Sequence, residues 1–241
     1  MGEAFLWGAI GSSALLVGAL VAYVATPSRK LIAIVMALGA GLLIGSVSFE
    51  LIDEALKLEE VGRVGAYTLI GAMVFTAGNW YLERRGGGSR KDASGSQGEG
   101  SPLAIVFGSI LDGIPESFVL GLTVLQGGVS VGLLTGIVLS NLPEGMSSSS
   151  GLRIAGWPRG RVIAMWLAVM AVSGVSAAIG YQVLRDPSRA SSAAIAQGFA
   201  AGALLAMVAD TLLPESYKVE RVFTGSWVAV GFAISLMLSS V

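Results

Sequence analysis

The sequence predicts an all-α integral membrane protein with eight transmembrane helices. Of its 241 residues, 54% are hydrophobic and only 13% are charged, and apolar stretches of membrane-spanning length recur along the chain. Soluble domains carry about 25% charged residues, so this composition excludes a soluble fold. We therefore expect residues 1–241 to form a single transmembrane domain.

Each expected span has the length and apolarity needed to cross the hydrocarbon core. In chain order the spans cover residues 4–25, 31–53, 64–82, 102–124, 128–149, 162–184, 192–213 and 222–241. The first is expected to remain as a helix, because Met1-Gly2-Glu3 lacks the positively charged start of a signal peptide. Residues 86–101 are rich in Gly and Ser and predict a flexible cytoplasmic loop.

Loop charges predict the orientation, because loops on the cytoplasmic side carry an excess of Lys and Arg. Most of the fifteen basic residues fall on one side of the expected topology: Arg29, Lys30, Arg84, Arg85, Arg90, Lys91, Arg153, Arg159, Arg161, Lys218 and Arg221. This pattern favours a multi-pass protein of the plasma (inner) membrane with both termini outside the cytoplasm.

Cysteine and histidine are both absent. Disulfides, thiolate and imidazole metal ligands, and mechanisms that need a histidine base or a cysteine nucleophile are therefore excluded. Any metal site must use oxygen donors, with methionine sulfur as the only soft ligand. No basic stripe with interleaved aromatic residues predicts a nucleic-acid partner, so the expected partner is the lipid bilayer.

One short pattern occurs twice inside apolar segments, as LDGIPE at residues 111–116 and LSNLPE at residues 139–144. The two copies lie in neighbouring spans, so they cross the membrane in opposite directions. An acid at the middle of a membrane helix costs about 2.5–3.5 kcal/mol even on lenient insertion scales, so its repetition indicates a use. The simplest use is to hold a cation.

A weaker similarity relates the second and seventh spans, in which residues 40–54 resemble residues 201–215. These spans also run in opposite directions. Inverted repeats with interrupted helices at the midplane are typical of secondary transporters. They predict a 3+2+3 arrangement, with two central helices between two groups of three.

The two motifs place polar groups four residues apart, about 6 Å from each other on one helical face. The pairs are Asp112 with Glu116 and Ser140 with Glu144, and Asn141 adds an amide oxygen. Together they predict an oxygen-rich site that carries up to three negative charges and suits a divalent cation.

Proline precedes each motif glutamate and is expected to bend its helix there. Pro115 and Pro143 cannot donate to the carbonyls of Leu111 and Leu139. Those carbonyls are further oxygen donors, which are tolerated at this depth only where they face protein or a wet cavity.

On these features the chain resembles the ZIP (ZRT/IRT-like) family of metal-ion transporters. The eight spans, the external termini, the loop at 86–101 and the run from Asn141 to Gly145 carry the resemblance, and residues 201–215 look like the family's seventh helix. In that family the fourth and fifth helices form the transport site for zinc and related divalent metals. The matching positions here are Asp112, Gly113, Glu116, Ser140, Asn141 and Glu144.

The chain departs from the family where many members have histidine at the start of each motif. The resemblance with these departures implies one metal site that favours harder cations, so that Mn²⁺ and Fe²⁺ join Zn²⁺ and Cd²⁺ as candidates. The metal would be the substrate, and no cofactor is expected. Some members also have a glutamate in the sixth helix, whereas residues 171–174 here contain Ser173 and no acid.

Further polar residues predict a route to the site. Ser173 in the sixth span is one such residue. Glu50 and Asp53 lie near the outer end of the second span, and Asp210 and Glu215 flank the inner end of the seventh. They would serve as entrance and exit, although acids at helix ends are often simply solvated at the membrane interface.

Three functions stay open at this point. The leading hypothesis is a transporter that moves a divalent metal toward the cytoplasm by alternating access. A transporter-like scaffold or sensor would bind metal without flux. An intramembrane aspartyl hydrolase would need two facing aspartates, and only Asp112 lies clearly at the midplane, so an enzyme is not expected. The resemblance leaves homodimerisation open, and the sequence locates no interface.

Overall fold

The computed structural model describes residues 1–25, 28–87, 102–124, 128–185 and 190–239, and every regular element in these ranges is a helix. The all-α fold class is therefore confirmed for the described part of the chain. Residues 88–101 of the predicted loop and residues 240–241 of the last predicted span lie outside it.

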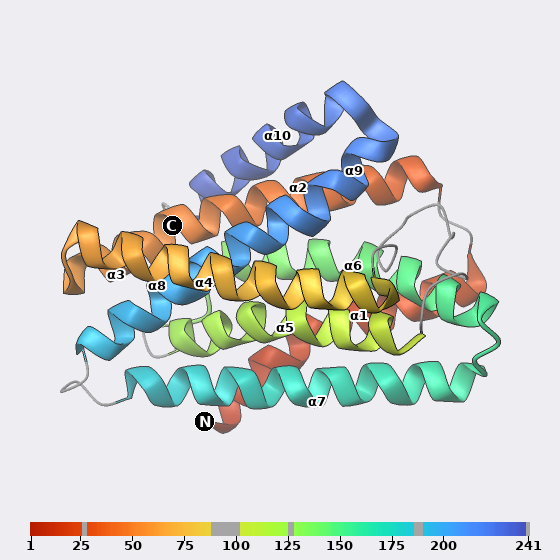
Figure 1. The fold of residues 1–241 in the computed structure, drawn as a ribbon, viewed down its shortest axis with the longest axis horizontal. Helices are drawn as coiled ribbons and strands as arrows, with labels where there is room; N and C mark the ends of the chain where they lie inside the picture. The colour runs from red at the N-terminus through yellow and green to blue at the C-terminus, as the bar shows by residue number, and fades with distance from the viewer. Residues whose placement is uncertain (26–27, 88–101, 125–127, 186–189, 240–241) are drawn as a thin grey trace.

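The helices form rods that run alternately in opposite directions (Figure 1). In chain order the elements are α1 (Gly2–Val24), α2 (Arg29–Ser46), the π-helical η1 (Val47–Ile52), α3 (Asp53–Leu58), α4 (Val61–Leu82), the π-helical η2 (Glu83–Gly87), α5 (Pro102–Val124), α6 (Val131–Ile154), α7 (Arg159–Leu184), α8 (Ala190–Met207), the π-helical η5 (Val208–Leu212), α9 (Leu213–Glu220), the 3-10 helix η6 (Arg221–Phe223) and α10 (Thr224–Leu238).

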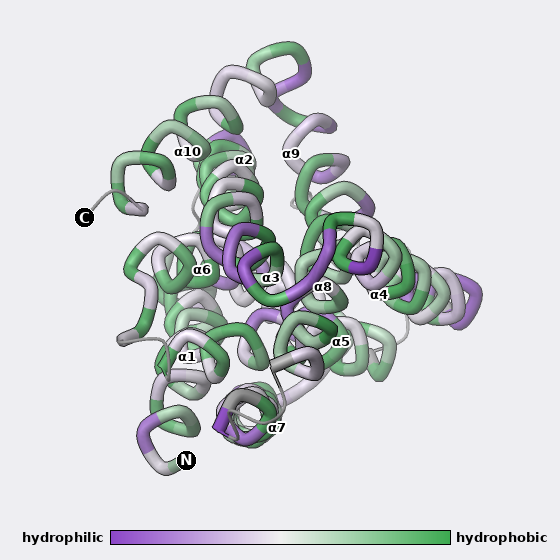
Figure 2. Tube along the Cα trace, turned by 90° about the vertical axis from the view of Figure 1, so that its left-hand side faces the viewer, coloured by the Kyte–Doolittle hydropathy of each residue, from purple (hydrophilic) through white to green (hydrophobic). Residues whose placement is uncertain are grey.

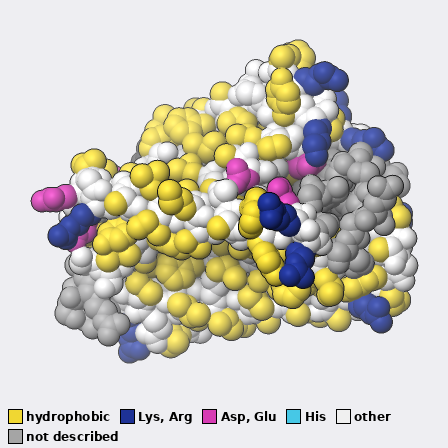
Figure 3. Space-filling view, viewed as in Figure 1, with side chains coloured by type: hydrophobic (Ala, Val, Ile, Leu, Met, Phe, Trp, Pro, Cys, Tyr) yellow, Lys and Arg dark blue, Asp and Glu magenta, His cyan; other side chains and the backbone are white. Residues whose placement is uncertain are grey.

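Six helices in the described part of the chain are long and apolar enough to cross a membrane. They are Gly2–Val24, Arg29–Leu58, Val61–Arg85, Leu103–Val124, Arg159–Val183 and Ser191–Leu238. Hydrophobic side chains also cover much of the face in Figure 3. These are the features of a helical membrane protein.

The six do not reproduce the eight predicted spans, for two reasons. The predicted spans 192–213 and 222–241 both fall in the stretch Ser191–Leu238, although the chain reverses near Arg221, whose φ is 51°. The span predicted at 128–149 corresponds to α6, which is not among the six. Its motif and the serines at 147–150 make α6 less apolar than its neighbours.

In the described part of the chain, α2 and α6 begin at serine caps. The Ser28 side chain accepts a hydrogen bond from the Leu31 backbone N–H at 3.2 Å, and the Ser130 side chain accepts one from Leu133 at 3.0 Å. Each serine satisfies one of the backbone donors that the first turn of a helix leaves unpaired. The start of α6 is therefore Val131, three residues later than predicted.

Four pairs of parallel helices meet at glycines, and each contact is reciprocal. In every pair, a Cβ on either glycine would overlap the backbone carbonyl oxygen of the residue three positions before the other glycine. The pairs are Gly18 and Gly145 between α1 and α6, Gly121 and Gly180 between α5 and α7, Gly41 and Gly231 between α2 and α10, and Gly71 and Gly202 between α4 and α8.

The missing Cβ lets the two backbones approach closely. In lipid, apolar side chains gain little free energy by packing against another helix, so close backbone contact at small residues favours helix association. The close approach also suits Cα–H···O contacts between the two backbones. These four helix pairs make the most extensive helix contacts in the described part of the chain.

The four pairs assemble into two groups. One group contains α1, α5, α6 and α7, and the other contains α2, α4, α8, α9 and α10. The view in Figure 2 shows the first group at the bottom and the second above and to the right. The groups meet mainly where α2 packs on α6 and where α8 packs on α5.

The π-helical segments occupy equivalent places in the two similar stretches of sequence. Val47 at the start of η1 follows Gly41 by six residues, and Val208 at the start of η5 follows Gly202 by six. Sequence similarity between 40–54 and 201–215 is thus accompanied by the same local departure from α-helix. Such π-helical turns are rare and occur frequently at functional sites.

The glycine contacts predict that glycine-to-alanine substitutions at two positions of α4 have opposite effects on the stability of the protein. Gly71→Ala is expected to destabilise the protein by about 1–3 kcal/mol, because its Cβ would press on the Phe199 backbone. Gly65→Ala is expected to stabilise it by about 0.5–1 kcal/mol, because nothing lies within 4 Å and alanine favours the helix. Thermal unfolding of the purified protein in one detergent tests both, and equal shifts in one direction would contradict the reciprocal contact.

Candidate functional site

The acids of the first motif lie on one face of α5 and are buried. Asp112 and Glu116 are each 2% exposed, and Pro115 lies inside the helix between them. Their four-residue spacing places the carboxylates one turn apart, as predicted. The second motif is equally buried in α6, where Ser140 is 1%, Asn141 3% and Glu144 2% exposed.

The two motifs are connected by a hydrogen bond from α6 to α5. Ser140 Oγ lies 3.1 Å from Glu116 Oε1 and 2.9 Å from the backbone oxygen of Ile137. The hydroxyl has one proton to share between these two acceptors. Ser140, which the sequence placed beside the site, therefore contacts the glutamate of the opposite helix directly.

A second hydrogen bond runs the other way, from α5 to α6. Ser109 Oγ donates to Glu144 Oε1 at 2.8 Å, and Ser109 is 2% exposed. Ser109 was not among the residues predicted from the sequence. Its signal was present, because Ser109 lies three residues before Asp112 and seven before Glu116, which puts all three on one face of α5.

Residues outside the central pair support the motifs. Asn141 Nδ2 donates to the backbone oxygen of Gly11 in α1 at 3.4 Å. On α7, Ser173 Oγ is the atom that a Cβ on Gly113 would meet, at 3.3 Å, so this predicted residue packs beside the first motif. The Asn141 amide nitrogen is thus engaged with the backbone, which leaves its carbonyl oxygen as the group suited to a cation.

A serine of α7 that the sequence did not single out also contacts the backbone of the first motif. Ser176 on α7 donates to the backbone oxygen of Ile114 at 2.8 Å, directly before Pro115. The backbone at this proline is therefore held by α7.

The predicted route residues have different surroundings. Asp53 is exposed and pairs with Lys57 at 2.9 Å. Asp210 is exposed, lies in η5 and accepts a hydrogen bond from Thr76 at 3.1 Å. Glu215 is buried and pairs with Lys218 at 2.6 Å.

Glu50 is half-buried in η1 and faces the start of α6. A Cβ on Gly132 would lie 3.2 Å from Glu50 Oε1 and 3.3 Å from Ser46 Oγ. One turn further along α6, a Cβ on Gly136 would lie 3.1 Å from Leu43 Cδ2, and the next turn brings Ser140. Gly132, which faces Glu50, and Ser140 of the second motif therefore lie on one face of α6. Leu43 packs on that face between them.

The carboxylates do not form a preassembled metal cage. Among the described residues, no group of three or more His, Cys, Asp or Glu side chains is close enough together to hold a metal ion. Glu116 and Glu144 instead accept hydrogen bonds from serine hydroxyl groups, which are neutral and weak partners that a divalent cation can displace.

Comparison of the chain with models of known protein families gives no match, and comparison with curated proteins gives none. The geometry of the buried motifs is therefore the basis on which a function is proposed.

The buried hydrogen bonds predict that removing one charge stabilises the metal-free protein. Glu116→Gln is expected to raise stability by about 1–2 kcal/mol, because a neutral amide costs less to bury and keeps an oxygen for Ser140. Thermal unfolding in chelator-treated buffer tests this, with Glu3→Gln at the exposed start of α1 as the control without effect. A lower melting temperature for Glu116→Gln alone would contradict it.

Proposed function

We propose that this protein transports a divalent metal ion across the membrane, toward the cytoplasm, by alternating access. One observation carries the proposal: the motif glutamates of two adjacent helices each accept a hydrogen bond from a serine of the other helix, Ser140 to Glu116 and Ser109 to Glu144. Each buried carboxylate therefore contacts the neighbouring helix through a serine hydroxyl, and a cation can replace that hydroxyl. The resemblance to ZIP transporters points to the same function.

The donor set supports a divalent cation as the substrate. Glu116 and Glu144 would be shared ligands, Asp112 the principal added charge, and the Asn141 carbonyl a further oxygen. All are hard oxygen donors, which suit Mn²⁺ and Fe²⁺ and accept Zn²⁺ and Cd²⁺. Binding would require the two serine hydroxyls to release the glutamates, so that the carboxylates converge on the ion.

We further propose eight spans in a 3+2+3 arrangement with inverted repeats. The equivalent positions of η1 and η5, and the glycine pairs that recur in the order expected for such repeats, support it. Because the glycine contacts lie within the two helix groups, the movement would occur between the groups, with α5 and α6 travelling together with α1 and α7. The external termini and the inner membrane follow from the loop charges.

Uptake into proteoliposomes tests the transport function directly. Wild-type protein is expected to load vesicles with at least one of Mn²⁺, Fe²⁺, Zn²⁺ and Cd²⁺, and Glu116→Ala combined with Glu144→Ala is expected to reduce the rate by about tenfold or more, since even outer partners of metal ligands cost about 10- to 100-fold. Glu3→Ala is the matched control. No uptake of any of the four ions, or unchanged uptake in the double variant, would overturn the proposal.

Metal binding can be separated from metal movement by thermal unfolding. An ion at about 100 times its dissociation constant is expected to stabilise the folded protein by about 2.7 kcal/mol, and Asp112→Ala is expected to weaken this shift. Stabilisation without uptake would instead indicate the scaffold or sensor function. Stabilisation that is unchanged in Asp112→Ala would remove Asp112 from the site.

The carboxylate ligands also predict the direction of the pH dependence. Protons compete with the metal for the same oxygens, so uptake is expected to slow as the external pH falls. Initial rates across a pH series at constant free metal test this. A rate that rises as the pH falls would contradict direct competition at the carboxylates.

A further inference from the structure

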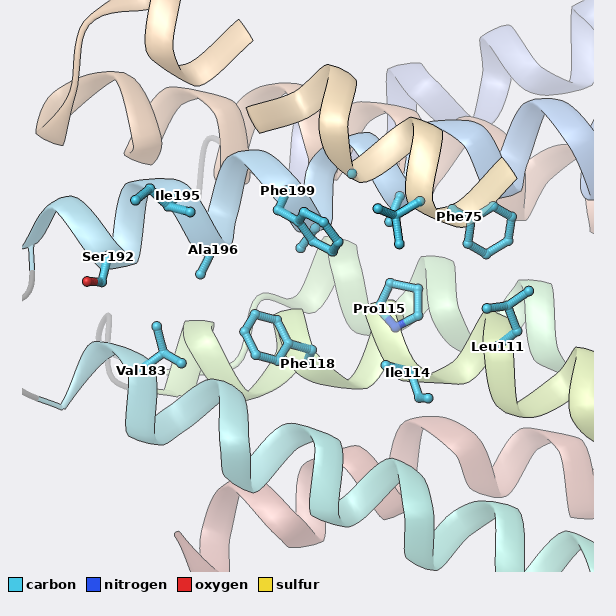
Figure 4. Close-up of a pocket in the computed structure, with 14 residues that line it drawn as sticks. Phe75, Leu111, Ile114, Pro115, Phe118, Val183, Ser192, Ile195, Ala196 and Phe199 are labelled. Carbon is cyan, nitrogen blue, oxygen red and sulfur yellow. The ribbon is translucent and has the colours of Figure 1, made fainter. Parts of the chain in front are cut away.

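An apolar cavity lies between the two helix groups, and its lining includes residues of the first motif but neither of the motif's acids. Its volume is about 460 Å³, and it is enclosed by α4, α5 and α8 and by the end of α7 (Figure 4). The lining is apolar apart from one serine and consists of Gly71, Val74, Phe75, Leu111, Ile114, Pro115, Phe118, Val183, Ser192, Ile195, Ala196, Phe199, Ala200 and Ala203.

The cavity is elongated along the helices. On α8 its lining begins at Ser192, two residues after the helix starts, and ends at Ala203. Eleven residues of α-helix correspond to a rise of about 16 Å. In Figure 4, Ser192 and Val183 lie at one end, and Pro115 and Leu111 lie toward the other. The cavity therefore runs from a helix end into the middle of the molecule.

The cavity is open to the surroundings of the protein along part of its length. Val74 is 55% exposed and Ile114 43% exposed, and both belong to helices able to cross a membrane. Water does not fill apolar cavities that offer it no hydrogen-bond partners. Surrounding hydrocarbon can fill this one.

The equivalent contact on the other side of the molecule is closed. There Gly39 of α2 packs against the Ser140 backbone of α6, with a Cβ position 2.9 Å from the Ser140 nitrogen. By the spacing that relates residues 40–54 to 201–215, the counterpart of Gly39 is Ala200, which lines the cavity. The two contacts between the groups are thus unequal, and the space lies between α8 and α5.

We propose that this cavity binds one acyl chain of a membrane phospholipid. Its volume falls within the range of about 300–1,000 Å³ typical of small-ligand sites. A helix of a second copy, about 10–12 Å across with its side chains, is too wide for it. Only a narrow, flexible and wholly apolar group matches the lining and the length.

A basic side chain at this end of the helices suits a phospholipid head group. Arg185 is exposed at the end of α7, one short step beyond Val183, which lines the cavity, and Ser192 lies at the same end of the cavity on α8. A guanidinium and a hydroxyl both bind phosphate oxygens. The head group would lie at the membrane interface while its acyl chain extends along α8 toward Pro115.

Native mass spectrometry of the purified protein tests the site. The wild type is expected to retain one phospholipid through detergent washing, and Ala196→Leu with Ala203→Leu, which fills the cavity, is expected to retain at least about tenfold less. Ala66→Leu with Ala229→Leu adds the same groups at exposed positions of α4 and α10 and is expected to leave retention unchanged. No retained phospholipid in the wild type, retention of another apolar compound, or equal retention in the filled variant would overturn the proposal.

A second measurement does not depend on the filled variant folding. The chain has no cysteine, so Ala196→Cys and Met73→Cys each give one labelling site, the first in the cavity and the second on the exposed face of α4. In nanodiscs with brominated phospholipid, a fluorescent label is expected to be quenched to a similar extent at both positions. Quenching at Met73→Cys without quenching at Ala196→Cys would overturn the proposal. The outcome is independent of metal transport.

Discussion

Contact between helix backbones at paired glycines is the constraint on which the rest of this structure depends. In lipid, helices gain little from burying apolar side chains against each other, so close backbone approach has to hold them together. The four reciprocal pairs, of which Gly71 with Gly202 is one, all lie within the two helix groups. The contacts between the groups differ: α2 packs closely on α6 at Gly39, whereas a cavity separates α8 from α5 at Ala200. The buried motifs lie on α5 and α6, at this boundary.

Acids in the molecule receive partners that differ with their position. At the helix ends, Asp53 and Glu215 pair with lysines. In the interior, Glu116 and Glu144 accept hydrogen bonds from serines. A lysine beside a buried glutamate would neutralise it and compete with any incoming cation, whereas a hydroxyl satisfies one oxygen without adding charge. The interior is therefore polar enough to hold the acids without neutralising them.

Several features of the fold and site could be predicted from the sequence because they depend on local spacing. Apolar stretches predict helices, and the four-residue interval predicts that Asp112 and Glu116 share a face. The similarity of residues 40–54 to 201–215 predicted related helices, but not the π-helical segments η1 and η5 within them. The spacing of Ser109 puts it on the face of Asp112 and Glu116, but spacing alone does not distinguish a serine that only packs there from one that binds an acid.

The sequence by itself determined that this is an all-helical chain with membrane-spanning stretches and acids at fixed places within them. Composition and periodicity suffice for that, since each acts within one helix. Only the tertiary structure decided that Asn141 donates to the backbone of Gly11, 130 residues away. It also decided that Ser109 and Ser140 each donate to the motif glutamate of the other helix, and that α8 and α5 line a cavity. The physical reason is that each of these features joins different helices, so it depends on how the separate helices pack together and not on the spacing of residues within one helix.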